Sequence, residues 1–141
     1  MPGQIFVSAV SHVLRVSTGC SFSLQPDESS PRFSALTGVV CLNGKNKGML
    51  FISLEENVLR HLTSRFTGAP EEEINEADQA DVLCEIVNMT AGNAKLQLNE
   101  TDFYFSFAPP FVIKAQDMTI MIKNRVRLDS FTLSDGDREI K

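Results

Sequence analysis

The sequence contains little cysteine, and the residues that are present do not form a recognisable pair or cluster. Cys20, Cys41 and Cys84 lie far apart in the chain, and none belongs to a Cys-x-x-Cys motif. Disulfide frameworks and structural zinc sites need more numerous and more closely spaced cysteines. The cysteine pattern therefore predicts reduced thiols and a cytoplasmic protein.

Long apolar runs and basic charge are also scarce. The apolar N-terminal stretch over residues 5–12 has no basic flank and is interrupted by serine and histidine, so we expect neither a signal peptide nor a membrane-spanning segment. The 13 Lys and Arg residues are outnumbered by 18 Asp and Glu residues, which gives a net charge of −5. Because the basic residues form no stripe, nucleic acid is a poor candidate partner.

What is present is the composition of an ordinary folded protein. The 141 residues are 43% apolar and 22% charged, and a chain of this length has room for one hydrophobic core. Neither an internal repeat nor a low-complexity linker divides the sequence. We therefore expect a single compact domain over residues 1–141, which excludes an enzyme with separate cofactor and substrate domains.

Hydrophobic periodicity predicts a mixture of helices and strands. Helices are expected over residues 4–17 with Gly19 at the end, from a cap at Ser53 to a stop at Gly68, and from the acidic residues 71–81 to Leu98. Strands are expected over residues 20–24, 36–42, 49–53, 103–107, 118–122 and 126–133, with a hairpin turn at 43–48, a loop at 25–34, and Pro109-Pro110 ending the fourth strand. The predicted class is α+β, with helices packed on a largely antiparallel sheet.

Common catalytic motifs are absent from the sequence. There is no G-x-G-x-x-G, Walker A or G-x-S-x-G motif, and residues 44–48 are more typical of a hairpin turn than of a phosphate cradle. His12 and His61 each stand alone on an expected helix, which favours a solvent-facing or capped side chain over a metal ligand or general base. Cys84 lacks a nearby basic partner, so we interpret it as a packing residue rather than a nucleophile.

One line of polar residues runs along the longest expected helix. At about 100° per residue, the apolar residues of this helix cover roughly 200° of its circumference. Asp81, Glu85, Asn88 and Gly92 share the remaining arc at spacings of four, three and four. The spacing alone is more typical of an ordinary solvated helix face. Asn88 and Gly92 are poor helix formers, however, which favours a docking surface that a partner approaches closely.

This helix resembles the signature helix of the CheC, CheX and FliY chemotaxis phosphatases. The resemblance rests on Asp81-x-x-x-Glu85-x-x-Asn88 and on the string E-I-V-N-M-T-A-G-N-A-K, and it extends more loosely over the whole chain. The single copy of the motif and the short chain look most like CheX. Two departures are visible: the prolines at 109 and 110 come slightly earlier than the family proline, and the strand expected after residue 137 is brief.

The resemblance implies a phosphatase that acts on the aspartyl phosphate of a CheY-type receiver domain. The receiver would supply the acceptor carboxylate, a lysine and bound Mg²⁺, so the chain would need no cofactor or metal of its own. The match gives Asn88 the task of orienting the attacking water and Glu85 that of pairing with the receiver lysine. Asp81 would support this contact, and Gly92 would leave room for the partner. Similarity to CheX also implies one active site per chain and a homodimer.

Other interpretations remain open at this point. The acidic residues 71–78 are explained by the favourable effect of negative charge at a helix N-terminus, with steering of a basic partner as the alternative. The second functional class is a binding module of the same fold that docks receivers or flagellar-switch components without hydrolysis. A small-ligand enzyme has no supporting residue cluster in the sequence.

Overall fold

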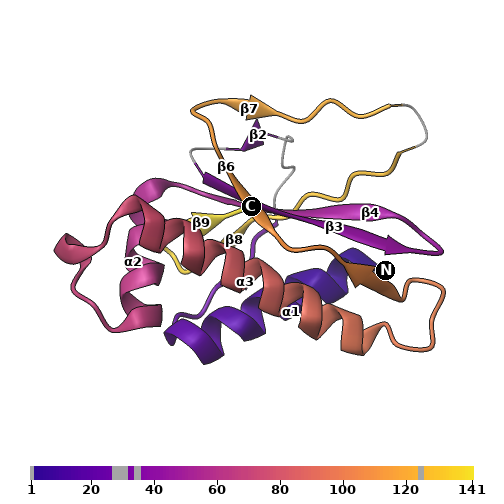
Figure 1. Cartoon of the computed structure of the whole chain (residues 1–141), viewed down its shortest axis with the longest axis horizontal. Helices are drawn as coiled ribbons and strands as arrows, with labels where there is room; N and C mark the ends of the chain where they lie inside the picture. Colours follow the sequence, from indigo (N-terminus) through magenta and orange to yellow (C-terminus); the bar gives the residue numbers. More distant parts are fainter. Residues whose placement is uncertain (1, 27–31, 34–35, 124–125) are drawn as a thin grey trace.

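The structure, a computed structural model, describes residues 2–26, 32–33, 36–123 and 126–141. Its helices are α1 (Pro2–Thr18), α2 (Glu56–Thr67) and α3 (Glu76–Gln97), with a short 3-10 helix η1 (Glu71–Glu73). Its strands are β1 (Ser23–Leu24), β2 (Arg32–Phe33), β3 (Leu36–Gly44), β4 (Gly48–Leu54), β5 (Phe105–Phe107), β6 (Phe111–Lys114), β7 (Met118–Thr119), β8 (Leu133–Ser134) and β9 (Glu139–Ile140). Figure 1 shows α1 and α3 along one side of the β3–β4 hairpin, with β2 and β7 on the other. The predicted α+β class is confirmed.

The first helix forms as its periodicity predicts. Ala9, Val10 and Leu14 recur at helical spacing and are buried against the rest of the core. The helix ends at Gly19, which adopts a left-handed conformation with φ of 74° and donates its N–H to the Arg15 carbonyl oxygen at 3.0 Å. No helix in the described part of the chain is both long enough and apolar enough to cross a membrane.

The predicted cap of α2 is wrong. The helix begins after Glu55, whereas Ser53 is a buried residue of β4. Ser53 exchanges backbone hydrogen bonds with Lys141, and its hydroxyl accepts a hydrogen bond from Thr37 at 3.1 Å. Pairing with the C-terminal segment therefore extends β4 beyond the residue that local sequence marks as a cap. The predicted stop at Gly68 is confirmed, because Gly68 has φ of 80° and closes the helix.

The third helix begins with a capping box that satisfies its exposed backbone donors. The Asn75 side chain accepts the backbone N–H of Asp78 at 2.8 Å, and the Asp78 carboxylate accepts the N–H of Asn75 at 3.2 Å. The glutamates at 71–73 lie in η1, separate from α3. The helix ends at Gln97 with Leu98 as its cap residue, as the periodicity predicts.

The predicted hairpin forms the centre of the sheet. β3 and β4 pair antiparallel from Leu36–Leu54 to Leu42–Gly48. Lys45 in the connecting turn makes an ion pair with Asp102 at 3.0 Å, which agrees with a structural turn. The strand order is β1-β8-β9-β4-β3-β5, and β6 pairs with β3 as well.

β5 and β6 share one edge of β3, and β6 was not predicted from the sequence. β5 pairs with residues 42–44 of β3, and β6 pairs with residues 36–39. The connection between them is held to β3 by the N–H of Ala108, which donates to the Cys41 carbonyl oxygen at 3.3 Å. Pro109 and Pro110 have no N–H for the ladder, so they interrupt the edge strand without ending its association with β3.

The later alternating segments form much shorter strands than predicted. Only Met118–Thr119 and Leu133–Ser134 are paired within the segments 118–122 and 126–133. Ile122, which the alternation places on the inward face, is 43% exposed, so the alternation there does not reflect burial against a sheet. The predicted strand at 20–24 is reduced to β1, and most of the loop predicted over 25–34 lies outside the described residues.

The C-terminal strand is brief, as predicted, but it does not form an edge of the sheet. β9 lies between β4 and β8, where Ile140 pairs with Leu54 on one side and with Leu133 on the other. Ile140 is 2% exposed. The last residues of the chain therefore close the sheet rather than offering it to a partner.

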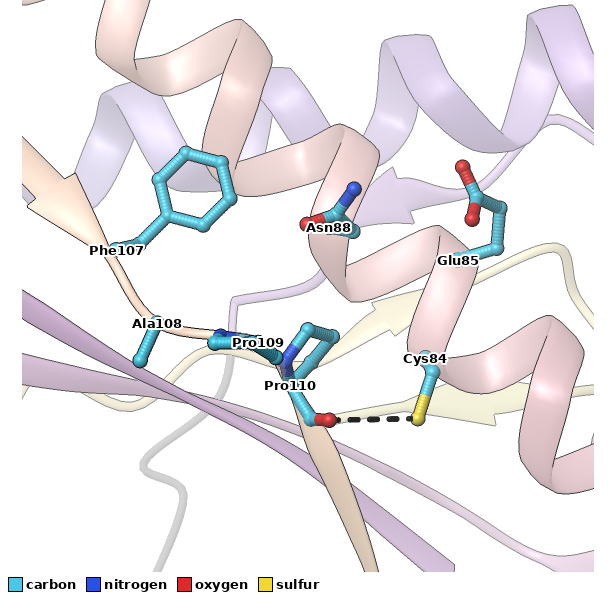
Figure 2. Close-up of a pocket in the computed structure, with 7 residues that line it drawn as sticks. All are labelled: Cys84, Glu85, Asn88, Phe107, Ala108, Pro109 and Pro110. Atoms are coloured by element: carbon cyan, nitrogen blue, oxygen red, sulfur yellow. Dashed lines mark hydrogen bonds between the residues drawn. The ribbon is translucent and has the colours of Figure 1, made fainter.

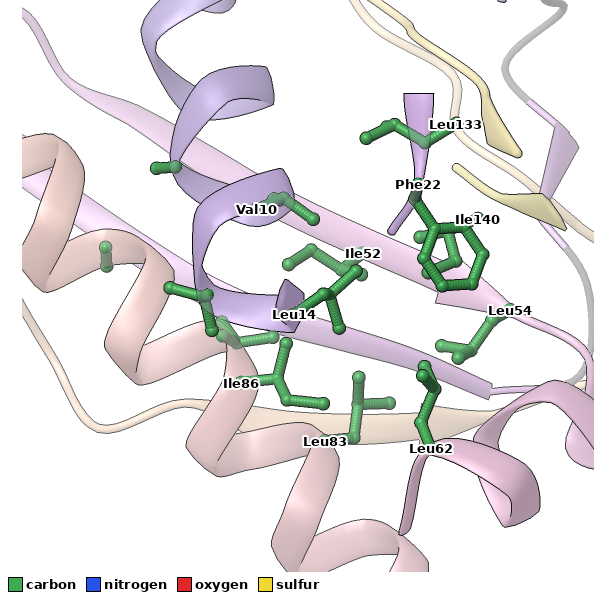
Figure 3. Packing of buried hydrophobic residues seen from close by; sticks show 14 of the residues in the cluster. Val10, Leu14, Phe22, Ile52, Leu54, Leu62, Leu83, Ile86, Leu133 and Ile140 are labelled. Atoms are coloured by element: carbon green, nitrogen blue, oxygen red, sulfur yellow. The ribbon is translucent and has the colours of Figure 1, made fainter. Parts of the chain in front are cut away.

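One hydrophobic core joins the helices to the sheet (Figure 3). It includes residues from all three helices and from the C-terminal strands: Val10, Leu14, Leu62, Leu83, Ile86, Leu133 and Ile140. Gly38 of β3 permits the close approach of α3, since a Cβ atom there would lie 2.5 Å from Val87 Cγ2 and 3.0 Å from Leu83 Cγ. This contact fixes which face of α3 is buried.

Candidate functional site

The polar line on α3 has the placement that its spacing predicts. Asp81 and Glu85 are exposed, and Asn88 and Gly92 are partly exposed. The opposite side of the helix is buried in the core through residues that include Val82, Leu83, Ile86, Val87, Ala91 and Ala94. We call Asp81, Glu85, Asn88 and Gly92 the α3 stripe. It is helix surface that a partner can reach.

Glu85 and Asn88 line a shallow groove beside α3. The groove has a volume of about 390 Å³, and its other lining residues are Cys84 and the segment from Phe107 to Pro110. Figure 2 shows Glu85 and Asn88 projecting from one side of α3 and the β5–β6 connection forming the facing wall. We call this the Asn88 groove. Asp81 and Gly92 continue the stripe but do not line the groove.

The two polar groups in the groove are free to bind a ligand. Within the described residues, the side chains of Glu85 and Asn88 make no hydrogen bond or ion pair, and the same holds for Asp81. An unpaired carboxylate accepts hydrogen bonds or binds a cation, and an unpaired amide both donates and accepts. The groove therefore offers one anionic group and one neutral polar group within four residues of the same helix.

The thiol in the groove is not a strong nucleophile. Burial raises the pKa of Cys84, and the nearby carboxylates of Asp81 and Glu85 raise this pKa further. Its Sγ lies 3.9 Å from the Pro110 carbonyl oxygen, which it contacts as a weak donor. These observations support the interpretation of Cys84 as a packing residue.

The wall opposite α3 contains residues to which sequence reasoning assigned no site role. Lys95 Nζ lies 5.9 Å from the centre of the Phe107 ring and 5.4 Å from that of Tyr104. Lys95 thus connects the C-terminal half of α3 to this wall. The sequence signal for this wall is the Pro109-Pro110 pair, which predicts the end of a strand and stands near the position of the family proline. Although the prolines come early relative to the family pattern, they do line the groove.

Gly92 is not required by the packing of this chain. A Cβ atom on Gly92 would meet no other atom within 4 Å, and its φ is not in the left-handed region. Glycine in a helix interior costs about 1 kcal/mol relative to alanine. Because nothing inside the chain accounts for this cost, the glycine is consistent with close approach from outside.

The structure places neither histidine in the groove. His61 lies beside Cys20 and Glu71, with its ring nitrogens 3.9 Å from the Cys20 Sγ and 3.9 Å from a Glu71 carboxylate oxygen. His12 lies in a different hollow, between α1 and α3. No group of three or more metal-ligating side chains occurs among the residues that the structure describes.

A known protein family matches more than half of the chain. Residues 36–132 match the family described as "Chemotaxis phosphatase CheX". No curated protein is a detectable sequence relative of the chain. The chemotaxis protein CheX from Vibrio vulnificus superposes with a TM-score of 0.84 at 22% identity, over 97% of this chain and 90% of that one.

Two further solved structures share the fold. CheX from Desulfovibrio desulfuricans has a TM-score of 0.80 at 20% identity, over 99% of this chain and 94% of that chain. A CheX–CheY–BeF3–Mg²⁺ complex from Borrelia burgdorferi has a TM-score of 0.68 at 20% identity, again over 99% of this chain and 94% of that chain. The arrangement of helices and sheet is therefore that of the CheC-like fold.

Proposed function

Because the chain belongs to the CheX family of chemotaxis phosphatases, we propose that it hydrolyses the aspartyl phosphate of a CheY-type receiver domain. The observation that carries the proposal is the pair of free polar groups, Glu85 and Asn88, on the exposed face of a rigid buried helix. Aspartyl-phosphate hydrolysis requires a positioned water and stabilisation of charge more than it requires a nucleophile of the enzyme. Two unpaired polar side chains on a fixed helix face are suited to that chemistry.

Asn88 is proposed to orient the attacking water. Its amide oxygen accepts a hydrogen bond from the water, and its amide nitrogen donates to an oxygen of the phosphoryl group or to the water. The water attacks phosphorus, the bond to the aspartyl oxygen breaks, and phosphate leaves with the receiver carboxylate restored. A rate increase of ten- to a thousandfold needs a barrier reduction of about 1.4 to 4 kcal/mol, which one positioned amide can provide.

Glu85 is proposed to hold the receiver in register. Its carboxylate lies one turn before Asn88 and has no partner among the described residues, so it can pair with the lysine of the receiver site. Asp81 extends this contact by one further turn, and Gly92 leaves room for the partner beside the helix. In this proposal Mg²⁺ is bound by the receiver and neutralises the phosphoryl charge. The Borrelia complex, which contains CheX, CheY, BeF3 and Mg²⁺, supports this division of tasks.

The proposal is tested by the decay of a phosphorylated receiver. A CheY-type receiver is phosphorylated with acetyl phosphate, and the loss of phosphate is followed with wild-type protein, Asn88→Ala and Asn99→Ala. Asn99 is an exposed asparagine beyond the end of α3, so it provides a matched control. We expect acceleration by wild type and by Asn99→Ala but not by Asn88→Ala. Equal decay with wild type and Asn88→Ala would exclude the catalytic role of this residue.

The same experiment separates catalysis from binding alone. A non-catalytic module that docks receivers or switch components predicts a stable complex, decay at the rate of the free receiver, and loss of binding in Glu85→Lys. A phosphatase predicts accelerated decay with the wild type, and it predicts that Asn88→Ala still binds the receiver without accelerating its decay. A receiver substrate also implies that the protein works in the cytoplasm.

We also propose that the chain forms a homodimer. The C-terminal strand β9 is not available as the dimer interface. β9 is internal, whereas β1 lies at one end of the strand order, and β5 and β6, which each pair with β3, lie at the other. Leu24 on β1 is 43% exposed and Phe111 on β6 is 46% exposed, so both edges present apolar surface. Sedimentation equilibrium should give twice the monomer mass. A monomer at concentrations where the phosphatase is active would contradict this part of the proposal.

A further inference from the structure

A second hollow lies between α1 and α3 and differs in charge from the Asn88 groove. It has a volume of about 320 Å³ and is lined by Ser8, Ser11, His12 and Arg15 of α1 and by Asn93 and Gln97 of α3. We call it the basic pocket. No carboxylate lines it, although the chain as a whole has a net charge of −5.

The α1 side of the basic pocket is a regular line of hydrogen-bond donors. Ser8, His12 and Arg15 follow one another at spacings of four and three, which places them on one face of the helix. Arg15 and His12 are exposed and, within the described residues, have no ion pair or hydrogen bond through their side chains. A guanidinium group without a carboxylate partner is available to an anion from outside.

The serines of the pocket are also available, in contrast to other hydroxyl residues of α1. Ser17 and Thr18 each donate to a carbonyl oxygen four residues earlier, at 2.6 Å in both cases. Ser8 and Ser11 make no such bond in the described structure. On the α3 side, the Gln97 amide donates to Asn93 at 2.7 Å, which holds both amides at the rim. The pocket therefore collects a cation, an imidazole, two hydroxyls and two amides around one space.

The basic pocket continues the surface of the α3 stripe. Gly92 belongs to the stripe, and its neighbour Asn93 belongs to the pocket. At about 100° per residue, Leu96 projects between these two positions. Leu96 is 78% exposed, so the described part of the chain leaves the surface that joins them open. A partner that lies on the stripe can extend across Leu96 to the pocket without leaving the surface.

We propose that the basic pocket binds an acidic side chain of the docked receiver domain, with Arg15 as the principal contact. This inference rests on the proposed function, because it takes the receiver as the occupant of the α3 stripe. The two ends of the surface then carry opposite charges: Asp81 and Glu85 attract a basic group of the receiver, and Arg15 attracts a carboxylate. Opposite charges at two separated points allow one orientation of the partner and disfavour the reverse one. The pocket thus orients the receiver, whereas the groove acts on its phosphate.

The test compares affinity with turnover in charge variants. Arg15→Glu replaces the cation by an anion, and Arg15→Lys keeps the positive charge. Lys123→Glu makes the same charge change in the segment after β7, on the side of the β3–β4 hairpin away from the helices (Figure 1). Each variant is titrated with a CheY-type receiver that carries beryllium fluoride at its phosphorylation site, and KM and kcat are measured with the phosphorylated receiver.

We expect Arg15→Glu to raise Kd and KM by about tenfold, equivalent to about 1.4 kcal/mol, while kcat at saturating receiver stays near the wild-type value. Arg15→Lys should recover most of the affinity, and Lys123→Glu should behave as wild type. Unchanged Kd and KM in Arg15→Glu, or an equal rise in Lys123→Glu, would overturn the inference while leaving the phosphatase proposal intact. If the wild-type chain neither binds nor dephosphorylates the receiver, the proposed function fails and this inference fails with it.

Discussion

Cys84 Sγ on α3 lies 3.9 Å from the carbonyl oxygen of Pro110, the residue just before β6. This contact ties the signature helix to the segment that forms the opposite wall of the Asn88 groove. The groove is therefore built from two parts of the chain that β3 holds in register, since both β5 and β6 pair with β3. Its shape follows from the sheet edge as much as from the helix.

The thiol at this contact should react slowly. Burial raises the pKa of Cys84, as do Asp81 and Glu85, so less of this thiol is ionised at pH 8 than for a thiol with the ordinary value of 9.0. Iodoacetamide should modify the exposed Cys41 first, and the reaction of Cys84 should begin at higher pH. Asp81→Asn should lower the Cys84 pKa and speed its alkylation. Peptide mass spectrometry measures all three rates, and preferential labelling of Cys84 in the wild type would contradict this description of the groove.

Gly92→Ala should have opposite effects on the stability of the protein and on its affinity for the receiver. The new methyl group meets no atom within 4 Å, and alanine stabilises a helix interior by about 1 kcal/mol relative to glycine. We therefore expect a higher free energy of unfolding in urea. If Gly92 leaves room for the receiver, the same variant should bind the receiver more weakly. A more stable protein with unchanged receiver affinity would show that the partner does not approach this position.

Gly38→Ala should destabilise the protein by about 1 to 3 kcal/mol, the range for overpacked cores. A Cβ atom at Gly38 would lie 2.5 Å from Val87 Cγ2, so α3 must move away from β3. Because α3 carries the stripe, phosphatase activity should fall as well. Gly48→Ala is the control, since a Cβ atom there meets nothing within 4 Å. Urea denaturation that gives the same free energy of unfolding for both variants would exclude the close contact between α3 and β3.

The free energy of unfolding should depend on the ionisation of Glu56, which accepts a hydrogen bond from the buried Gln79. The Gln79 amide donates to a Glu56 carboxylate oxygen at 2.9 Å, and this bond, together with those from Arg60, lowers the pKa of Glu56 below the ordinary value of 4.5. A lowered carboxyl pKa contributes stability that is present above the unfolded-state pKa and is lost as the pH falls through the folded-state pKa. Glu56→Gln should therefore reduce the loss of stability between about pH 5 and pH 3. Thermal unfolding across that range measures the effect, and identical pH profiles for both proteins would contradict it.

Local patterns predicted the helices and the polar stripe well, because those features depend on residues that are close in sequence. The spacing of Asp81, Glu85 and Asn88 determines which face of α3 they share, and the structure places that face outward. The capping box of Asn75 and Asp78 was not predicted, although it too consists of residues close in sequence. The resemblance to chemotaxis phosphatases rested on the same segment, and the family match covers it.

The hairpin of β3 and β4 was predicted from its turn, but features that depend on pairing between distant segments were not predicted correctly. Ser53 has the chemistry of a helix cap, but its pairing with Lys141 keeps it in β4. Pro109 and Pro110 suggested the end of a strand, whereas β3 recruits β6 directly after them. The basic pocket needed two helices to be placed side by side, so nothing in the α1 sequence alone identified it. These features become visible only when distant segments are brought together.

The central claim is that Asn88 accelerates aspartyl-phosphate hydrolysis in a bound receiver. The most direct measurement is the single-turnover decay of a phosphorylated CheY-type receiver, with either wild type or Asn88→Ala in saturating excess. We predict that wild type accelerates decay by about ten- to a thousandfold and that Asn88→Ala, although bound, leaves it near the rate of the receiver alone. Decay that is equally fast with saturating Asn88→Ala would contradict the account.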